Sequence, residues 1–170
     1  ETDSANLVEA LTDSLEAYKA DFVADIVGTS GDDELTGNTL DNRIEGGDGD
    51  DILTVVSGNN VLDGGAGNDA ISISVSGGEV NTVDGGDGAD DTLTVDVQDD
   101  TNDDEIETTL DVSKTETVTF DFADGNDTLT LSNSSALNGV DTLNVQDGTL
   151  DLTKIGGSAA AQGITDINVS

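Results

Sequence analysis

The chain contains 170 residues, with 38 acidic side chains against four basic ones and a formal net charge of −34 at pH 7. Nucleic acids and anionic lipid surfaces attract cationic proteins, so this balance argues against both as partners. The negative charge favours metal ions as partners instead. Without bound cations, repulsion among the acidic side chains opposes a compact fold.

Histidine, cysteine and tryptophan are absent from the chain. Without histidine or cysteine, no Ser-His or Cys-His nucleophile can be assembled. Paired carboxylates can hydrolyse glycosides, but no tryptophan platform is present to hold a sugar. We therefore expect no enzyme. No apolar run is long enough to span a bilayer, so we expect no membrane insertion.

The N-terminal segment, residues 1–27, is predicted to hold an α-helix over 4–27. Its large apolar side chains recur in steps of four, four, three and four, which places them on one helical face. They are Leu7, Leu11, Leu15, Tyr18 and Phe22. A helix that covers the open end of a solenoid is the preferred interpretation, since solenoids need capped ends. A helix that mediates assembly is the alternative.

Three stretches after this segment share one pattern: GGDGDDILT (46–54), GGAGNDAIS (64–72) and GGDGADDTL (85–93). The pattern G-G-x-G-x-D-x-U-x is typical of a calcium-binding repeat in a parallel β-helix. Its glycines allow positive φ and turn backbone carbonyls toward a cation, and its aspartate supplies a hard anionic oxygen. Three copies on a shared nine-residue register, which begins at Gly28, make the prediction strong.

The sixth position of this register alternates between aspartate and asparagine. In order it holds Asp33, Asn42, Asp51, Asn60, Asp69, Asn81 and Asp90. If two nonapeptides form one coil, all the aspartates lie on one edge and all the asparagines on the other. We therefore predict one calcium-loaded edge and an opposite edge held by an asparagine ladder, because neutral amides are weak calcium ligands.

The aliphatic residues that follow these positions are predicted to line the core of the solenoid. They are Leu35, Ile44, Leu53, Leu62, Ile71, Val83 and Leu93. Each has β-branched or aliphatic neighbours, which suit short strands.

The rest of the chain, 98–170, is predicted to continue the solenoid with longer and less regular coils. The acidic stretch 98–107 is expected to form a surface loop, and clustered carboxylates that hold calcium loosely are the alternative. Thr-rich segments within 91–120 resemble segments within 141–169, and a partial nonapeptide at 124–131 retains Asp127 between them. A separate β-sandwich is the alternative. The final residues, 166–170, are predicted to form a strand with an open edge that invites pairing.

The register over 28–93 resembles the RTX (repeats-in-toxin) calcium-binding family, and 124–131 resembles it in part. The resemblance implies an all-β, calcium-stabilised parallel β-roll over 28–97, secretion by a type I system and folding outside the cell. It also implies that several Ca²⁺ ions are held by sixth-position aspartates and by carbonyls of the glycine turns. The residues that match are Asp33, Asp51, Asp69 and Asp90, with turn positions Gly28, Ser30, Asp32, Gly46, Asp48, Asp50, Gly64, Ala66, Asn68, Gly85 and Asp87, and Asp127 in the partial repeat. The later Thr-rich repeats are similar to those of RTX-type bacterial surface-layer proteins and large secreted adhesins.

These observations favour a secreted, extracellular structural protein that folds on calcium and assembles into a homopolymer, as a cell-surface layer or filament. A calcium-dependent adhesin or binding module is the alternative, as is an RTX segment of a larger secreted protein. The adhesin hypothesis depends on whether three Thr-x-Thr pairs stack on one exposed face. These pairs are Thr92/Thr94, Thr117/Thr119 and Thr128/Thr130.

Overall fold

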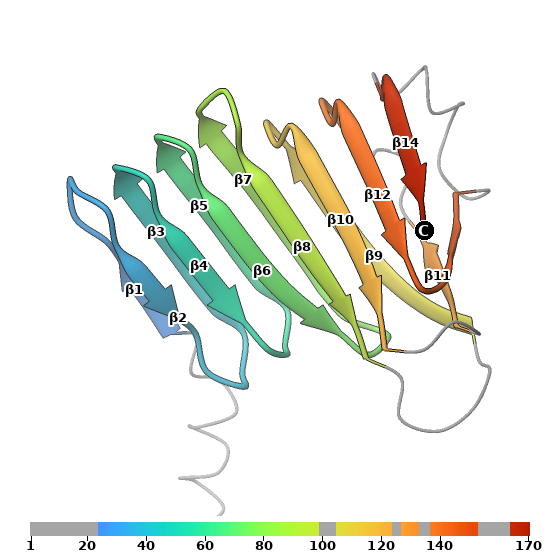
Figure 1. The fold of residues 1–170 in the computed structure, drawn as a ribbon. Helices are drawn as coiled ribbons and strands as arrows, with labels where there is room; N and C mark the ends of the chain where they lie inside the picture. The colour runs from blue at the N-terminus through green and yellow to red at the C-terminus, as the bar shows by residue number, and fades with distance from the viewer. Residues whose placement is uncertain (1–23, 99–104, 124–126, 133–136, 153–163) are drawn as a thin grey trace, which may run out of the picture.

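The computed structural model describes residues 24–98, 105–123, 127–132, 137–152 and 164–170. These residues form a β-solenoid in which the chain alternates between two parallel sheets (Figure 1). Within the described ranges, each sheet contains seven strands, and every paired strand runs parallel to its neighbour. The predicted all-β parallel solenoid is confirmed.

One sheet holds the odd-numbered strands and is called the odd sheet here. In order, it contains β1 (Ala24–Val27), β3 (Asn42–Asp48), β5 (Asn60–Ala66), β7 (Val80–Asp87), β9 (Glu105–Ser113), β11 (Thr128–Leu131) and β13 (Thr149–Asp151).

The other sheet, the even sheet, holds the even-numbered strands. In order, it contains β2 (Glu34–Thr36), β4 (Ile52–Val55), β6 (Ala70–Val75), β8 (Thr92–Val97), β10 (Thr117–Phe122), β12 (Thr142–Gln146) and β14 (Asp166–Val169).

The early coils contain 18 residues, as the alternation of aspartate and asparagine predicts. In the odd sheet Ile26 pairs with Ile44 and Ile44 with Leu62. In the even sheet Leu35 pairs with Leu53 and Leu53 with Ile71. Two nonapeptides therefore make one coil, and equivalent side chains stack along the solenoid.

The core is the aliphatic layer between the two sheets. Strand residues alternate between buried and outward positions, which is the period-two pattern of a strand with one buried face. All seven predicted core residues point into this layer. Ile44, Leu53, Leu62, Ile71, Val83 and Leu93 are fully buried, and Leu35, in the first coil, is partly buried.

The later coils are longer but belong to the same two sheets. Thr92 pairs with Thr117 and Thr117 with Thr142, which is a repeat of 25 residues. Phe120 lies fully buried between Val95 and Val145 of the adjacent strands. The described later strands continue the two sheets of the solenoid and do not form a separate sandwich, because β8, β10 and β12 are neighbours in one sheet.

Two segment predictions need correction. Residues 24–27 form strand β1 and not the end of a helix, since they pair with Asn42–Glu45 of β3. The remainder of the predicted helix lies outside the described residues, among which no helix is present. Residues 105–107 of the predicted loop begin strand β9, and 99–104 also lie outside the described residues.

The predicted C-terminal strand is confirmed as β14, which pairs with β12 at the edge of the even sheet. Its residues are exposed, with Ile167 at 53% and Val169 at 74%. No helix in the described part of the chain is long and apolar enough to cross a membrane.

Candidate metal centre

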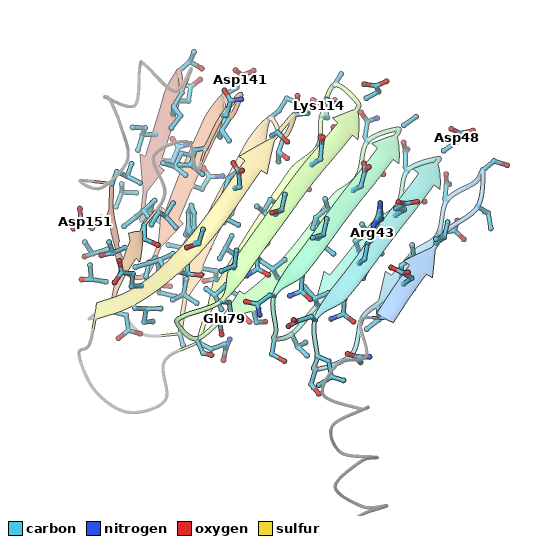
Figure 2. The ribbon with its side chains drawn as sticks, turned by 180° about the vertical axis from the view of Figure 1, so that it is seen from behind. Arg43, Asp48, Glu79, Lys114, Asp141 and Asp151 are labelled. Atoms are coloured by element: carbon cyan, nitrogen blue, oxygen red, sulfur yellow. The ribbon has the colours of Figure 1, made fainter. Side chains whose placement is uncertain are left out.

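The glycine-rich turns stack along one edge of the solenoid, where odd-numbered strands pass into even-numbered ones. In Figure 1 these are the turns at the upper ends of β3, β5 and β7. Figure 2 shows Asp48, Lys114 and Asp141 along this edge and Glu79 on the opposite edge. The stacking follows from the 18-residue register, because Gly47 pairs with Gly65 and Gly65 with Gly86.

A ladder of buried aspartates runs along this edge inside the turns. The backbone N–H of Asp33 donates to Asp51 Oδ1, that of Asp51 to Asp69 Oδ1, and that of Asp69 to Asp91 Oδ1, each at 2.8 Å. The N–H of Asp91 then donates to Glu116 Oε2 at 2.7 Å. The carboxylates therefore stand one coil apart, about 4.8 Å.

The prediction that Asp90 occupies the fourth position is wrong, because Asp91 occupies it. The turn after Gly85 is one residue longer than the earlier turns, so the register moves by one. Asp90 is exposed, and its N–H donates to Asn68 Oδ1 at 3.2 Å. The spacing to the core identifies the right residue: Ile71 comes two residues after Asp69, and Leu93, its partner, comes two residues after Asp91. Glu116 lies outside the nonapeptide register. The only sequence signal for its place in the ladder is its position just before β10.

A second ladder runs outside the first, at the fifth position of the register. The N–H of Asp50 donates to Asp32 Oδ1 at 3.0 Å, and the N–H of Asn68 donates to Asp50 Oδ1 at 2.8 Å. In this outer ladder the later coil donates to the earlier one, whereas in the inner ladder the earlier coil donates to the later one. Each turn is therefore bound to both of its neighbours by side-chain acceptors.

In three of the four inner aspartates the second carboxylate oxygen is left without a hydrogen bond, whereas Asp33 Oδ2 accepts from the N–H and the hydroxyl of Thr29 at 2.6 and 2.8 Å. The Oδ2 atoms of Asp51, Asp69 and Asp91 are buried and have no donor, and each residue is only 1% exposed. Burial, opposed by the hydrogen bond from the neighbouring N–H, raises the pKa of Asp69 and of Asp91 above the ordinary 3.8, and adjacent carboxylates add to the rise. Unpaired buried charge is strongly unfavourable. A bound cation would remove that penalty.

Backbone carbonyls approach the same oxygens. A Cβ added at Gly46 would overlap both Asp51 Oδ2 and the carbonyl oxygen of Gly64. A Cβ at Gly64 would overlap Asp69 Oδ2 and the carbonyl oxygen of Gly85 in the same way. Carboxylate and carbonyl oxygens together are the ligands that Ca²⁺ prefers, so the residues present fit this ion.

The other predicted turn positions lie in the same stack, and some of their carbonyls are already engaged. Gly49 N–H donates to the Ala66 carbonyl at 2.7 Å, and Gly67 N–H donates to the Asp87 carbonyl at 3.3 Å. Each carbonyl oxygen has a second lone pair. In the described residues, no three acidic, histidine or cysteine side chains converge on one point. A cation here therefore requires backbone oxygens.

Predicted residue Asp127 is not part of this edge. It is buried at the opposite edge, where β10 passes into β11, and its carbonyl accepts a hydrogen bond from Thr149 N–H at 2.9 Å. The structure therefore separates Asp127 from the aspartate ladder.

The opposite edge carries the predicted asparagine ladder, which is confirmed. The side-chain Nδ2 of Asn42 donates to Asn60 Oδ1 at 2.8 Å, and Nδ2 of Asn60 donates to Asn81 Oδ1 at 3.0 Å. The backbone N–H groups of Asn42 and Asn60 donate to the same oxygens at 3.1 Å. An amide supplies both donors and acceptors, so this edge holds together without a cation.

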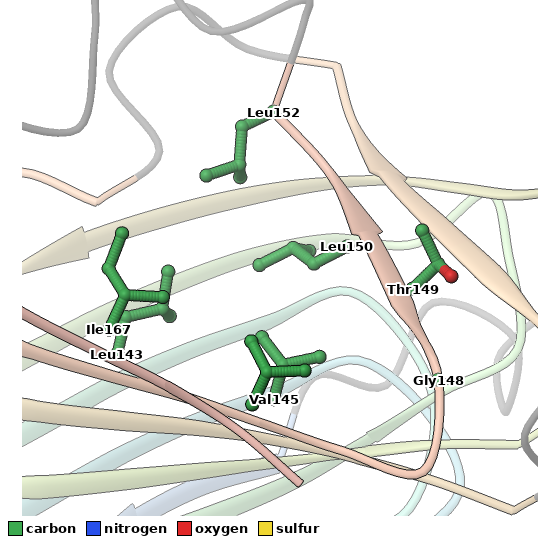
Figure 3. A pocket seen from close by; sticks show the side chains of 8 residues that line it. Leu143, Val145, Gly148, Thr149, Leu150, Leu152 and Ile167 are labelled. Carbon is green, nitrogen blue, oxygen red and sulfur yellow. The ribbon is translucent and has the colours of Figure 1, made fainter.

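An apolar cavity of about 290 Å³ lies where β12, β13 and β14 meet (Figure 3). Its lining includes Leu143, which belongs to the core, Leu150, which packs against the core, and the exposed Ile167. The lining contains no charged side chain that would orient a substrate. This cavity is an opening beside the C-terminal end of the core, bordered by exposed residues of β14.

No protein-family model matches the chain, and no curated protein or solved structure matches it either. The geometry of the aspartate edge is therefore the main guide to function.

Proposed function

We propose that the chain is a secreted, RTX-like structural protein that folds on binding calcium and then assembles into a surface layer or filament. The observation that carries this proposal is the row of three buried carboxylate oxygens without donors, at Asp51, Asp69 and Asp91. Without a cation the row consists of stacked like charges, each of which raises the free energy of the folded state.

Calcium suits these sites better than magnesium. Calcium accepts six to eight oxygen ligands in flexible geometry, whereas magnesium demands a strict octahedron and keeps several of its waters. The candidate ligands are carboxylates and carbonyls carried by stacked turns whose spacing is set by the sheets. Such an arrangement tolerates variable ligand geometry but offers little room for retained water.

The energetic contribution of calcium would be a large fraction of the stability of a typical domain. At a concentration ten times its dissociation constant, one ion stabilises the folded state by about 1.4 kcal/mol. Ions in the gaps between the inner aspartates would together contribute about 4 kcal/mol, against roughly 5–15 kcal/mol for a typical domain. Extracellular modules bind calcium at roughly 0.1–1 mM, so a protein of this kind folds where calcium is abundant.

The adhesin alternative loses its main support. The Thr-x-Thr pairs on β8 and β10 are in register on the even sheet, but the third pair lies on β11 of the odd sheet, where Thr130 is buried. The three pairs therefore do not form one exposed array.

The direct test is a calcium titration of the metal-stripped chain, followed by circular dichroism and by particle size. We expect β-structure to form with calcium, and particle growth to follow. Asp51→Asn should weaken the calcium response by about tenfold or more, whereas its exposed neighbour Asp50→Asn should change it little. A metal-stripped chain that is already fully folded and insensitive to calcium would refute the proposal.

A further inference from the structure

Charge is distributed unevenly between the outer faces of the two sheets. On the odd sheet, Glu45, Asp63 and Asp84 stack in register and face outward. Arg43 pairs with Glu45, and Lys114 Nζ lies 3.7 Å from Asp84 Oδ2. Partial burial, followed by the charges of Asp84 and Glu45, raises the pKa of Asp63. This face therefore carries a column of acidic side chains, with two basic side chains beside it.

The outer face of the even sheet is different. One outward position forms a column of hydroxyl and amide side chains that crosses every strand of the sheet. In register, it contains Thr36, Thr54, Ser72, Thr94, Thr119, Asn144 and Asn168. Within the column, Asn168 Nδ2 donates to Asn144 Oδ1 at 2.9 Å, and Asn144 Nδ2 donates to Thr119 Oγ1 at 3.1 Å.

On one side of this column, the adjacent outward column is also neutral on the inner strands, whereas the column on its other side includes Asp96 and Asp121. The neutral adjacent column contains Ile52, Ala70, Thr92, Thr117 and Thr142. We call these five residues, with Thr54, Ser72, Thr94, Thr119 and Asn144, the neutral face. None of its ten members is charged, although a quarter of the chain's residues are.

We infer that the neutral face is the surface through which one copy of the chain contacts a second copy. The inference rests on the proposed function, since it names the contact by which copies assemble. Two chains that each carry −34 approach with the least repulsion through a surface without charge, because like charges at close range repel.

The chemistry of the neutral face is complementary to itself. Threonine and serine hydroxyls both donate and accept hydrogen bonds, and so does an asparagine amide. A two-fold contact brings a surface patch against an identical patch, so the patch must be complementary to itself. Groups that both donate and accept hydrogen bonds meet this requirement, whereas like charges repel each other. Ile52, 49% exposed, adds apolar area that the contact would remove from water.

A second copy is a better occupant than a neutral polysaccharide. Aromatic side chains supply large, rigid contact area, and a sugar-binding face gains most from them. The aromatic side chains of the even sheet, Phe120 and Phe122, are buried in the core and do not reach this face.

The contact is small. Five strands at about 4.8 Å span about 24 Å, which gives the neutral face an area on the order of 300 Å² per copy. Stable interfaces bury about 800 Å² per partner. A single contact is therefore weak, and repeated contacts in a layer or filament would raise the overall affinity without new chemistry.

The test uses a charge placed in the centre of the neutral face and a matched charge on the odd sheet. Thr94→Asp changes the neutral face, and Thr82→Asp changes an exposed threonine on the opposite sheet. Sedimentation velocity over a range of protein concentrations, with calcium present, measures self-association. Circular dichroism in the same buffer verifies that each variant is folded.

We expect Thr94→Asp to weaken self-association by about tenfold or more while folding is unchanged, and Thr82→Asp to behave as the parent chain. Equal effects of the two variants, or no self-association of the folded parent chain at any concentration reached, would overturn the inference. So would a loss of retention on cellulose or chitin by Thr94→Asp without a change in self-association, which would assign the face to a glycan.

Cysteine cross-linking gives an independent measurement, because the chain has no cysteine of its own. Ser72→Cys should form disulfide-linked dimers under mild oxidation, and Thr82→Cys should form fewer. Self-association through the neutral face in a chain that needs no calcium would contradict the proposed function but support this inference. Calcium-dependent folding with assembly unaffected by Thr94→Asp would do the reverse.

Discussion

The backbone N–H of Asp69 donates to Asp91 Oδ1 at 2.8 Å, across 22 residues of chain. The preceding step of the ladder, from Asp51 to Asp69, spans 18 residues with the same geometry. Three of the four extra residues lie between Asp69 and Asn81, where β6 passes into β7, and one lies in the turn before β8, yet the carboxylate position is kept. The position of the aspartate in space is conserved along the stack, and the count of residues between aspartates is not.

Replacement of Asp91 by asparagine should have opposite effects in the two metal states. The amide keeps an acceptor for Asp69 N–H but removes a buried charge, so the metal-free protein should become more stable by about 1 kcal/mol. With calcium, the same variant should lose about 1–2 kcal/mol of stability, because a ligand is weakened. Thermal unfolding with calcium and with a chelator measures both. Asp90→Asn is the control, and a similar response from it would contradict the ladder assignment.

Alanine at Gly46 should disrupt the candidate site directly. The new methyl group would overlap the Gly64 carbonyl oxygen and Asp51 Oδ2, so we expect a loss of about 2–3 kcal/mol and a much weaker calcium response. Gly31 is the matched control, since no atom lies within 4 Å of the position its Cβ would take. Gly31→Ala should be neutral or stabilising by up to about 1 kcal/mol. Denaturant unfolding distinguishes the two, and equal losses would show that the turn tolerates no side chain at all.

The asparagine edge should stabilise the fold independently of calcium. Asn60→Ala removes the acceptor for the backbone N–H and the side-chain amide of Asn42, both of which are buried. Unsatisfied buried donors cost about 1–3 kcal/mol each, so the free energy of unfolding should fall by about 2–4 kcal/mol. The decrease should be the same with and without calcium. A decrease seen only with calcium would indicate a cation at this edge as well.

The turn before β7 should make stability depend on pH. Partial burial acts to raise the pKa of Glu79, but hydrogen bonds from the Ser76 hydroxyl at 2.8 Å, Ser76 N–H at 3.2 Å and Gly77 N–H at 2.7 Å outweigh it and hold the pKa below 4.5. A lowered folded-state pKa contributes stability above the unfolded pKa, and that contribution disappears as the pH falls through the folded pKa.

Glu79→Gln removes this titration. The difference in melting temperature between the parent chain and the variant should therefore be largest near neutral pH and should shrink below pH 4.5. Titration of the aspartate edge affects both proteins alike and cancels in the comparison. A difference that stays constant down to acid pH would contradict the hydrogen-bonded state of Glu79.

The repeat predicts the parts of the fold that depend on periodicity. The 18-residue coil, the stacked core residues and the asparagine ladder all follow from the alternation of Asp33, Asn42 and Asp51 along a constant register. Each of these features involves positions that recur at fixed spacing. One local pattern therefore determines contacts between residues that are distant in the chain.

The errors arise where local pattern and neighbouring strands disagree. Ala24–Val27 continues a helical apolar pattern in the sequence, but its alternation also fits a strand, and pairing with β3 decides in favour of the strand. The charges of residues 105–107 suggest a loop, yet Ile106 points into the core while Glu107 faces outward. In both segments, pairing with a neighbouring strand of the stack determines that a strand forms. A single stretch of sequence does not show that pairing.

The opposed ladders of the glycine turns have a mechanical consequence. A pull along the stacking axis loads the inner and outer side-chain bonds of each turn together, because one set points toward the next coil and the other toward the preceding coil. Once an end coil detaches, its 18 residues can extend by about 60 Å. The solenoid would then lengthen in discrete steps, as coils detach one after another from its ends. In the proposed calcium-bound state, the ions would raise the force at which the early coils detach.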